Sequence, residues 1–147
     1  MALLNSPNIH FHFLVNFTLR NRRALKSYIE GILKKEGKKL ESINYIFCSD
    51  EYLLDINRRF LEHDYYTDII TFNLSDKGQP VNAEIFISAD RVKDNAARLG
   101  VSFTEEILRV MFHGVLHLCG YKDKSKVQQQ EMRAKEDYYL RRYLKKR

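Results

Sequence analysis

One segment of the sequence, residues 104–118, is apolar on nearly every side of the helix that its spacing predicts. Phe112 and Leu116 lie on one side, and the other side carries five apolar residues, which are Ile107, Val110, Met111, Val115 and Leu118. A helix that is apolar all round has no face to offer to water, so it must lie inside the protein. Ser102 and Glu105 have the spacing of a capping box and define its start. The remaining elements must therefore pack around this helix.

Two histidines interrupt the apolar surface of this central helix. His113 and His117 are four residues apart, which places both imidazoles on one face, one above the other. A buried imidazole has to be hydrogen-bonded or ligated, because an unsatisfied polar group costs about 1–3 kcal/mol. Two imidazoles in this register can bind one Zn²⁺ ion. The alternative is a pair of core or surface histidines with no metal.

A possible third ligand follows the helix. Gly120 can take a left-handed conformation and end the helix sharply, so that the chain turns back and Asp123 reaches the same ion. Three protein ligands with one position left for water are typical of a catalytic zinc site. Two alternatives stay open: Asp123 is a loop or cap residue, or Cys119 is the third ligand. A helical projection points Cys119 away from the histidines, which favours a buried apolar role for it.

Shorter patterns define the rest of the fold. Alternating apolar residues predict strands at residues 9–15, 42–48, 68–72 and 83–87. Spacing and capping residues predict helices at residues 21–35, 50–61, 88–100 and 126–144. The last two strands flank a short turn and are close enough to form a hairpin. We therefore predict an α+β fold, with a single domain over residues 1–147 and one mixed four-stranded sheet packed with helices.

The histidine spacing resembles the metzincin metalloprotease signature, with one difference. In that signature a glutamate follows the first histidine and acts as the general base. Gly114 occupies this position here. A peptidase without its base lacks the group that activates water for attack on an amide. The sequence therefore argues against a protease and favours another hydrolysis.

A longer match is to the YbeY-type endoribonucleases, whose signature reads His-Gly-x-Leu-His-Leu-x-Gly-Tyr-Asp-His. Residues 113–121 match its first nine positions, and further matches lie at Ile56–Asn57, Thr67–Phe72, Ala83–Ile85, Met132 and Glu136. The resemblance implies an α+β fold and a bacterial, single-strand-specific, metal-dependent endoribonuclease. It implies a role in 16S ribosomal RNA 3′-end maturation and ribosome quality control. By position it also implies one zinc ion, held by His113, His117 and residue 123.

The chain departs from this family pattern at two places. Asp123 stands where the family has its third histidine, and a carboxylate oxygen is an acceptable zinc ligand. Leu61 stands where the family has a functional arginine. We take Arg59 and His63, with Arg58 as a further candidate, to be the groups that stabilise developing charge in its place. The predicted catalytic residues are therefore His113, His117, Arg59 and His63.

The distribution of charge fits a polyanionic partner. Residues 20–39 hold eight basic and two acidic residues, and residues 122–147 hold ten basic and four acidic ones. These segments would hold the backbone of single-stranded RNA, and ribosomal subunits are the expected larger partners. Tyr65, Tyr66 and Tyr121 are candidates for stacking on unpaired bases. Solvated helix faces and ordinary tyrosine packing are the alternatives, and Glu106 is expected to be a surface residue.

Two other functions stay open. One is a zinc metalloprotease-like hydrolase. The other is a non-catalytic, ribosome-associated RNA-binding module with a structural zinc, for which Cys119, His63, His10 or His12 would be the fourth ligand. No stretch approaches the roughly 18 apolar residues of a membrane span, so no membrane partner is expected. Two cysteines form no disulfide framework, and a cytoplasmic location is expected by default.

Overall fold

A computed structural model of the chain describes residues 7–146. Residues 1–6 and 147, which the prediction of one domain over 1–147 includes, lie outside the described residues. The strands are β1 (Ile9–Phe13), β2 (Leu40–Cys48), β3 (Ile69–Asn73) and β4 (Val81–Ser88). The helices are α1 (Arg22–Lys35), α2 (Asp50–Leu61), α3 (Ala89–Leu99), α4 (Phe103–Leu118) and α5 (Lys126–Lys146). Every predicted element is present, with its ends shifted by a few residues.

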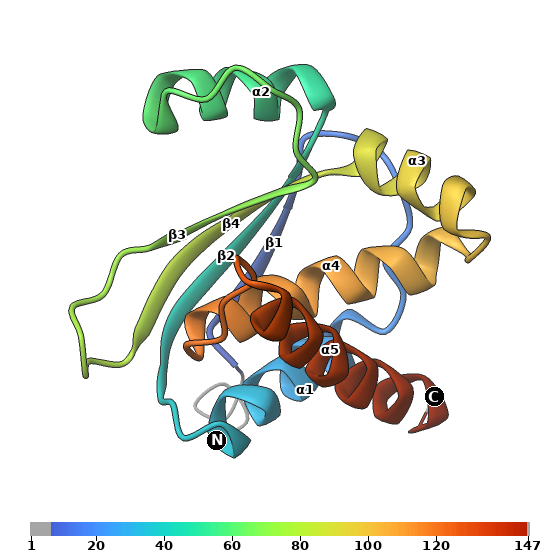
Figure 1. Cartoon of the computed structure of the whole chain (residues 1–147). Coiled ribbons are helices and arrows are strands. Elements are labelled where there is room, and N and C mark those ends of the chain that lie inside the picture. Colours follow the sequence, from blue (N-terminus) through green and yellow to red (C-terminus); the bar gives the residue numbers. More distant parts are fainter. Residues whose placement is uncertain (1–6, 147) are drawn as a thin grey trace.

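The four strands form one mixed sheet in the order β1-β2-β4-β3 (Figure 1). β1 pairs with β2 and β2 pairs with β4 in parallel, whereas β3 pairs with β4 in antiparallel register. The predicted α+β class, the mixed four-stranded sheet and the hairpin of the last two strands are therefore confirmed. β3 is an outer strand, and this position later brings it beside the functional site.

Helices cover both faces of the sheet. α4, α1 and α5 lie on one face, and α2 lies on the other, where Leu53 packs with Cys48 and Ile70 (Figure 1). The two basic helices α1 and α5 are neighbours, since the hydroxyl of Tyr28 donates to the backbone carbonyl of Tyr139 (2.6 Å). In the described part of the chain, no helix has the length and apolar character of a membrane span.

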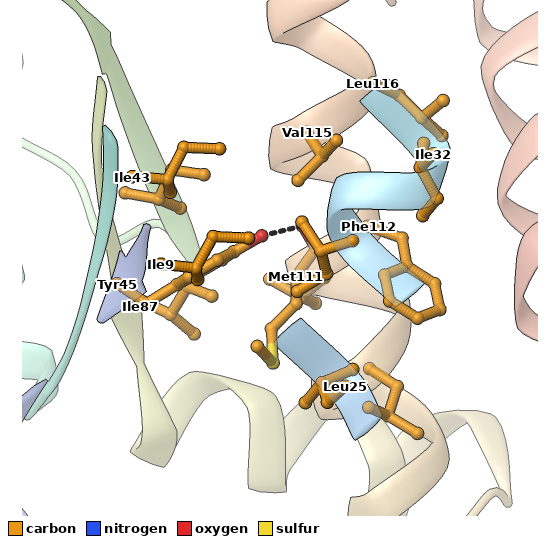
Figure 2. Packing of buried hydrophobic residues seen from close by; sticks show 14 of the residues in the cluster. Ile9, Leu25, Ile32, Ile43, Tyr45, Ile87, Met111, Phe112, Val115 and Leu116 are labelled. Carbon is orange, nitrogen blue, oxygen red and sulfur yellow. Dashed lines mark hydrogen bonds between the residues drawn. The ribbon is translucent and has the colours of Figure 1, made fainter. Parts of the chain in front are cut away.

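α4 is the central, buried helix that the sequence predicts. Its side chains pack between the sheet and α1, with Met111, Phe112 and Val115 fully buried (Figure 2). Full burial of such an apolar side chain contributes about 1.5–3 kcal/mol. The buried hydroxyl of Tyr45 on β2 donates to the carbonyl of Met111 (3.0 Å), which joins helix and sheet. The helix that carries the histidines is therefore held rigidly.

Glu106 corrects the sequence interpretation. It was expected on the surface, but its side chain on α4 is buried, with only 5% of the residue exposed. The reason is the helix itself, which is covered on nearly every side, so a polar residue on it is buried as well. One carboxylate oxygen of Glu106 is buried without a hydrogen-bond partner among the described residues. Burial raises the pKa of this carboxyl, although nearby Arg109 opposes the shift.

Candidate metal centre

The structure brings His113, His117 and Asp123 to one point. The two Nε2 atoms lie 3.0 Å apart, and the Oδ2 atom of Asp123 lies 3.3 Å from each of them. α4 ends at Leu118 with Cys119 as its C-cap, and Gly120 has a φ of 104°, a left-handed value that turns the chain back toward the histidines. One ligand atom from each residue falls within 4.8 Å of the others. The helix and the turn after it therefore assemble a three-residue cluster.

The hydrogen bonds of the two imidazoles show what this cluster can bind. Nδ1 of His117 lies 2.9 Å from the carbonyl oxygen of Tyr121, which can only accept, so this nitrogen carries the proton. Nδ1 of His113 lies 2.6 Å from the carboxylate of Glu136 and donates to it. Both Nε2 atoms are then free to offer a lone pair to the same point as the Asp123 carboxylate. Three such donors around one point fit a divalent cation such as Zn²⁺.

Glu136 supports the cluster from outside it. In the sequence it stands out only through the family match at Met132 and Glu136. It lies on α5, and its side chain is almost fully buried. Arg109 of α4 contacts both Glu136 (3.2 Å) and Asp137 (2.8 Å), which orients the Glu136 carboxylate. Burial lowers the pKa of His113, but the hydrogen bond and charge of Glu136 outweigh it and raise the pKa above its ordinary value.

A signal for Glu136 is present in the sequence. It shares the buried stripe of α5 with four apolar residues at helical spacing, which are Met132, Tyr139, Leu140 and Tyr143. A carboxylate on such a stripe must find a cation or a donor inside the protein. Here it finds both, in Arg109 and His113.

Gly114 explains why the metzincin base has no counterpart here. A Cβ atom on Gly114 would lie 3.0 Å from Cδ1 of Ile69 and 3.2 Å from two atoms of Ile85. Any side chain at this position would therefore press on Ile69 and Ile85, which would have to move aside. A glutamate there would clash with the core, so the metalloprotease arrangement does not fit this fold.

A cleft of about 520 Å³ opens beside the three residues. His113, His117 and Asp123 form one side, and the chain from Asn57 to Asn73 supplies the rest, including His63. Asp68, which the sequence analysis did not consider for the site, also lines the cleft, and burial raises the pKa of its carboxyl. Such a shift brings a carboxyl group closer to the pH range in which it can both hold and release a proton.

The other candidates lie away from this cleft. Arg59 pairs with Asp55 (3.1 Å) on the exposed side of α2, and neither Arg59 nor Arg58 lines the cleft. Leu61 does line it, at the position where an arginine was expected. The reason is the direction of α2, whose exposed side carries both arginines. Of the three candidates Arg58, Arg59 and His63, only His63 therefore lines the cleft beside the cluster.

Cys119, the alternative third ligand, and the possible fourth ligands His10 and His12 are also separated from the cluster. Cys119 lines a second hollow with Glu36, and burial raises the pKa of its thiol to about 12. His10 and His12 lie on β1, where their Nε2 atoms contact Asn8 and Asn44, both at 2.7 Å. Within residues 7–146, only one group of three or more potential ligands comes together, and it contains none of these side chains.

Two of the three tyrosines are as exposed as expected. Tyr65 and Tyr66 are 56% and 47% exposed. Tyr121 was expected to be exposed, but it is partly buried, because its hydroxyl donates to Glu36 (2.9 Å) and its ring lies under Lys135. Tyr66 contacts Glu51 and Arg91, so only Tyr65 remains beside the cleft.

Comparison with known proteins places the chain in a family. The family model "Endoribonuclease YbeY" matches residues 15–144. The chain is 52% identical over 124 residues to Endoribonuclease YbeY of Cytophaga hutchinsonii, which covers 84% of this chain and 87% of that protein. It is 46% identical to the protein of the same name from Flavobacterium johnsoniae, over 88% of this chain and 92% of that one.

A solved structure agrees with these sequence matches. The solution structure of TM1509 from Thermotoga maritima superimposes with a TM-score of 0.65 at 29% identity, covering 90% of this chain and 86% of that one. The resemblance noted from residues 113–121 therefore extends over nearly the whole chain. The chain belongs to the YbeY family of endoribonucleases.

Proposed function

We propose that this endoribonuclease cuts single-stranded RNA with one Zn²⁺ ion held by His113, His117 and Asp123. Ribosomal RNA in its 16S 3′-end maturation, on ribosomal subunits in the cytoplasm, is the proposed substrate. The observation that carries the proposal is the convergence of three potential ligand atoms within 4.8 Å of one another. Hydrogen bonds to Glu136 and to the Tyr121 carbonyl support it by orienting both rings.

Each residue around the proposed ion has its own role in hydrolysis. When bound, the ion supplies Lewis acidity at a phosphoryl oxygen and lowers the pKa of a coordinated water. Glu136 accepts a hydrogen bond from the Nδ1–H of His113, which keeps the Nε2 atom of His113 directed at the proposed ion. Asp68 lines the same cleft and is suited to hold or release a proton there. His63 lines the same cleft, where its imidazole would stabilise negative charge on the substrate.

An open coordination position favours catalysis over a structural zinc. Structural sites are usually closed by four protein ligands. Among the described residues, the cluster contains three, and its solvent side is the cleft. This arrangement favours an enzyme over a non-catalytic RNA-binding module with a structural zinc.

The test is metal analysis coupled to cleavage of a fluorescent single-stranded RNA. We expect His117→Ala and Asp123→Ala to lose both bound zinc and cleavage, because each removes one of three ligand atoms. His12→Ala and Asp55→Ala are matched controls, since both side chains lie on exposed surfaces outside the cluster. These controls should keep metal content and rate.

Two results would contradict the proposal. Full zinc content in Asp123→Ala would remove Asp123 from the ligand set. Cleavage at the wild-type rate by metal-free protein, checked after chelation and dialysis, would remove the ion from the reaction.

A further inference from the structure

The open edge of the sheet runs along the cleft beside the metal centre. β3 is the last strand of the sheet, so one of its edges has no neighbouring strand (Figure 1). The N–H of Ser88 donates to the carbonyl of Asp68 (2.9 Å), and the N–H of Leu74 donates to β4 (2.7 Å), so even-numbered residues face β4. In an antiparallel pair the alternate residues direct their backbone groups the other way. The outward-facing residues are Ile69, Thr71 and Asn73.

These three residues also line the cleft with the metal cluster. Thr71 is the central one, and its N–H and C=O point outward together from an extended backbone. The Ile69 carbonyl already accepts the hydroxyl of Thr67 (3.4 Å). Within residues 7–146, the strand order leaves no neighbour for the Thr71 pair. Thr71 therefore offers one donor and one acceptor, side by side, to a molecule in the cleft.

An aromatic pair forms another part of the same cleft. The rings of His63 and Tyr65 stack with centroids 5.1 Å apart and planes 20° from parallel. The Tyr65 hydroxyl lies 2.9 Å from Nδ1 of His63, and the amide of buried Asn57 donates to the Tyr65 carbonyl (2.9 Å). Three separate contacts thus hold an exposed aromatic platform in place. Such platforms suit flat rings.

The charge of the cleft indicates which part of a nucleotide binds there. Its lining residues include no lysine or arginine, so it holds no permanently charged cation for a phosphate away from the metal ligands. A base, by contrast, has a flat face for the aromatic pair and an edge with donors and acceptors for Thr71. The phosphate would then lie toward the histidines and the base toward β3.

We propose that this cleft binds one unpaired base of the RNA, stacked on Tyr65 with its hydrogen-bonding edge against the backbone of Thr71. The inference rests on the proposed endoribonuclease function and names a part of its substrate site. It makes Tyr65 and the β3 edge determinants of substrate binding next to the cut.

The first test pairs a change in the protein with a change in the RNA. A fluorescent ten-nucleotide RNA is prepared with one abasic position moved stepwise along it. For the wild type, we expect KM to rise about 5- to 100-fold when the abasic position occupies the cleft, which is the scale of one base–aromatic stack. In Tyr65→Ala this penalty should vanish, because the platform is already gone. Tyr66→Ala is the control, since that ring contacts Glu51 and Arg91 instead.

The second test addresses the strand edge. Proline lacks the N–H group but is tolerated on an edge strand where that group faces away from the sheet. Thr71→Pro should therefore weaken discrimination among the four bases at the position found above, whereas Thr71→Val keeps the N–H and should retain it. Thermal unfolding and zinc content show whether each variant is folded.

The outcomes separate the inference from the proposed function. A wild type that cuts no RNA contradicts the proposed function itself. A wild type that cuts RNA with an abasic penalty equal to that of Tyr65→Ala overturns the base site alone. Competitive inhibition by an extended peptide, with no effect of base identity, would assign the β3 edge to peptide binding and overturn the proposal as well.

Discussion

Single residues determine the tautomer and the orientation of the imidazoles at the proposed metal centre. Glu136 touches no proposed substrate, but it accepts a hydrogen bond from the Nδ1–H of His113, which leaves Nε2 available. Arg109 keeps the carboxylate oriented from the other side. Loss of such an outer partner typically lowers metal affinity by about 10–100-fold. Glu136 is therefore a positioning residue whose effect is measurable in binding, apart from activity.

We expect Glu136→Ala to bind zinc about 10–100-fold more weakly than the wild type, measured by competition with a chromophoric chelator. Glu136→Gln should lose less zinc affinity, because its amide oxygen can still accept a hydrogen bond from the Nδ1–H of His113. Glu131→Ala, another acid of α5 that is exposed, should bind zinc normally. Equal affinity in all four proteins would show that Glu136 has only a packing role.

Glu106 gives a prediction for stability against pH. Burial raises its pKa in the folded state, so its ionisation favours unfolding. Its contribution to stability is complete below the pKa of the unfolded state and is lost as the pH rises through the folded value. Glu106→Gln should therefore unfold at a higher temperature than the wild type at pH 7, with the difference shrinking at pH 4. A constant difference at both pH values would contradict this assignment.

At the scale of elements, the distance between α4 and the sheet controls where the histidines sit. Gly114 permits this close approach, and a Cβ there meets Ile69 and Ile85 at 3.0–3.2 Å. Gly31 on α1 has nothing within 4 Å of the same added atom. The two positions can therefore be compared directly, because an added Cβ atom is crowded at Gly114 and has no neighbour within 4 Å at Gly31.

We expect Gly31→Ala to stabilise the protein by up to about 1 kcal/mol, the gain in helix propensity. Gly114→Ala should gain the same propensity but lose about 1–3 kcal/mol to overpacking, with a net loss of stability. Urea unfolding measures both. If the two substitutions shift the midpoint alike, α4 and the sheet can separate freely and the close approach carries no cost.

At the scale of the whole molecule, charge is concentrated on one side. The basic segments at residues 20–39 and 122–147 contain α1 and α5, which pack together. Lys126 and Arg133 of α5 line a hollow that also touches His113 and Asp123. A single strand that crosses the metal centre would meet these cations first.

We expect Lys126→Ala and Arg133→Ala each to raise the KM for RNA and to reduce the slope of log KM against log salt by about 0.7. Lys77→Ala, in the turn between β3 and β4, is the control and should keep the wild-type slope. Slopes that stay equal across the three variants would place the RNA on another face.

Much of the fold followed from the sequence because local patterns and global packing agree. The apolar helix, the capping residues and the hairpin turn each point to one structure, and all appear. The cluster of His113, His117 and Asp123 was also predictable, since helix spacing and Gly120 fix its geometry locally. The proposed base site was not, because no sequence pattern shows that the loop after α2 and the edge of β3 line one cleft with the metal cluster. Nor did the sequence show that Arg59 pairs with Asp55 on the exposed side of α2, outside the cleft.

The last helix of the fold has a consequence for how the enzyme becomes active. The carboxylate that organises His113 arrives from α5, 23 residues further along the chain. A polypeptide cut short before residue 126 would keep His113, His117 and Asp123, the proposed metal ligands, and still lack the group that orients His113. We therefore expect such an unfinished copy to cut RNA poorly.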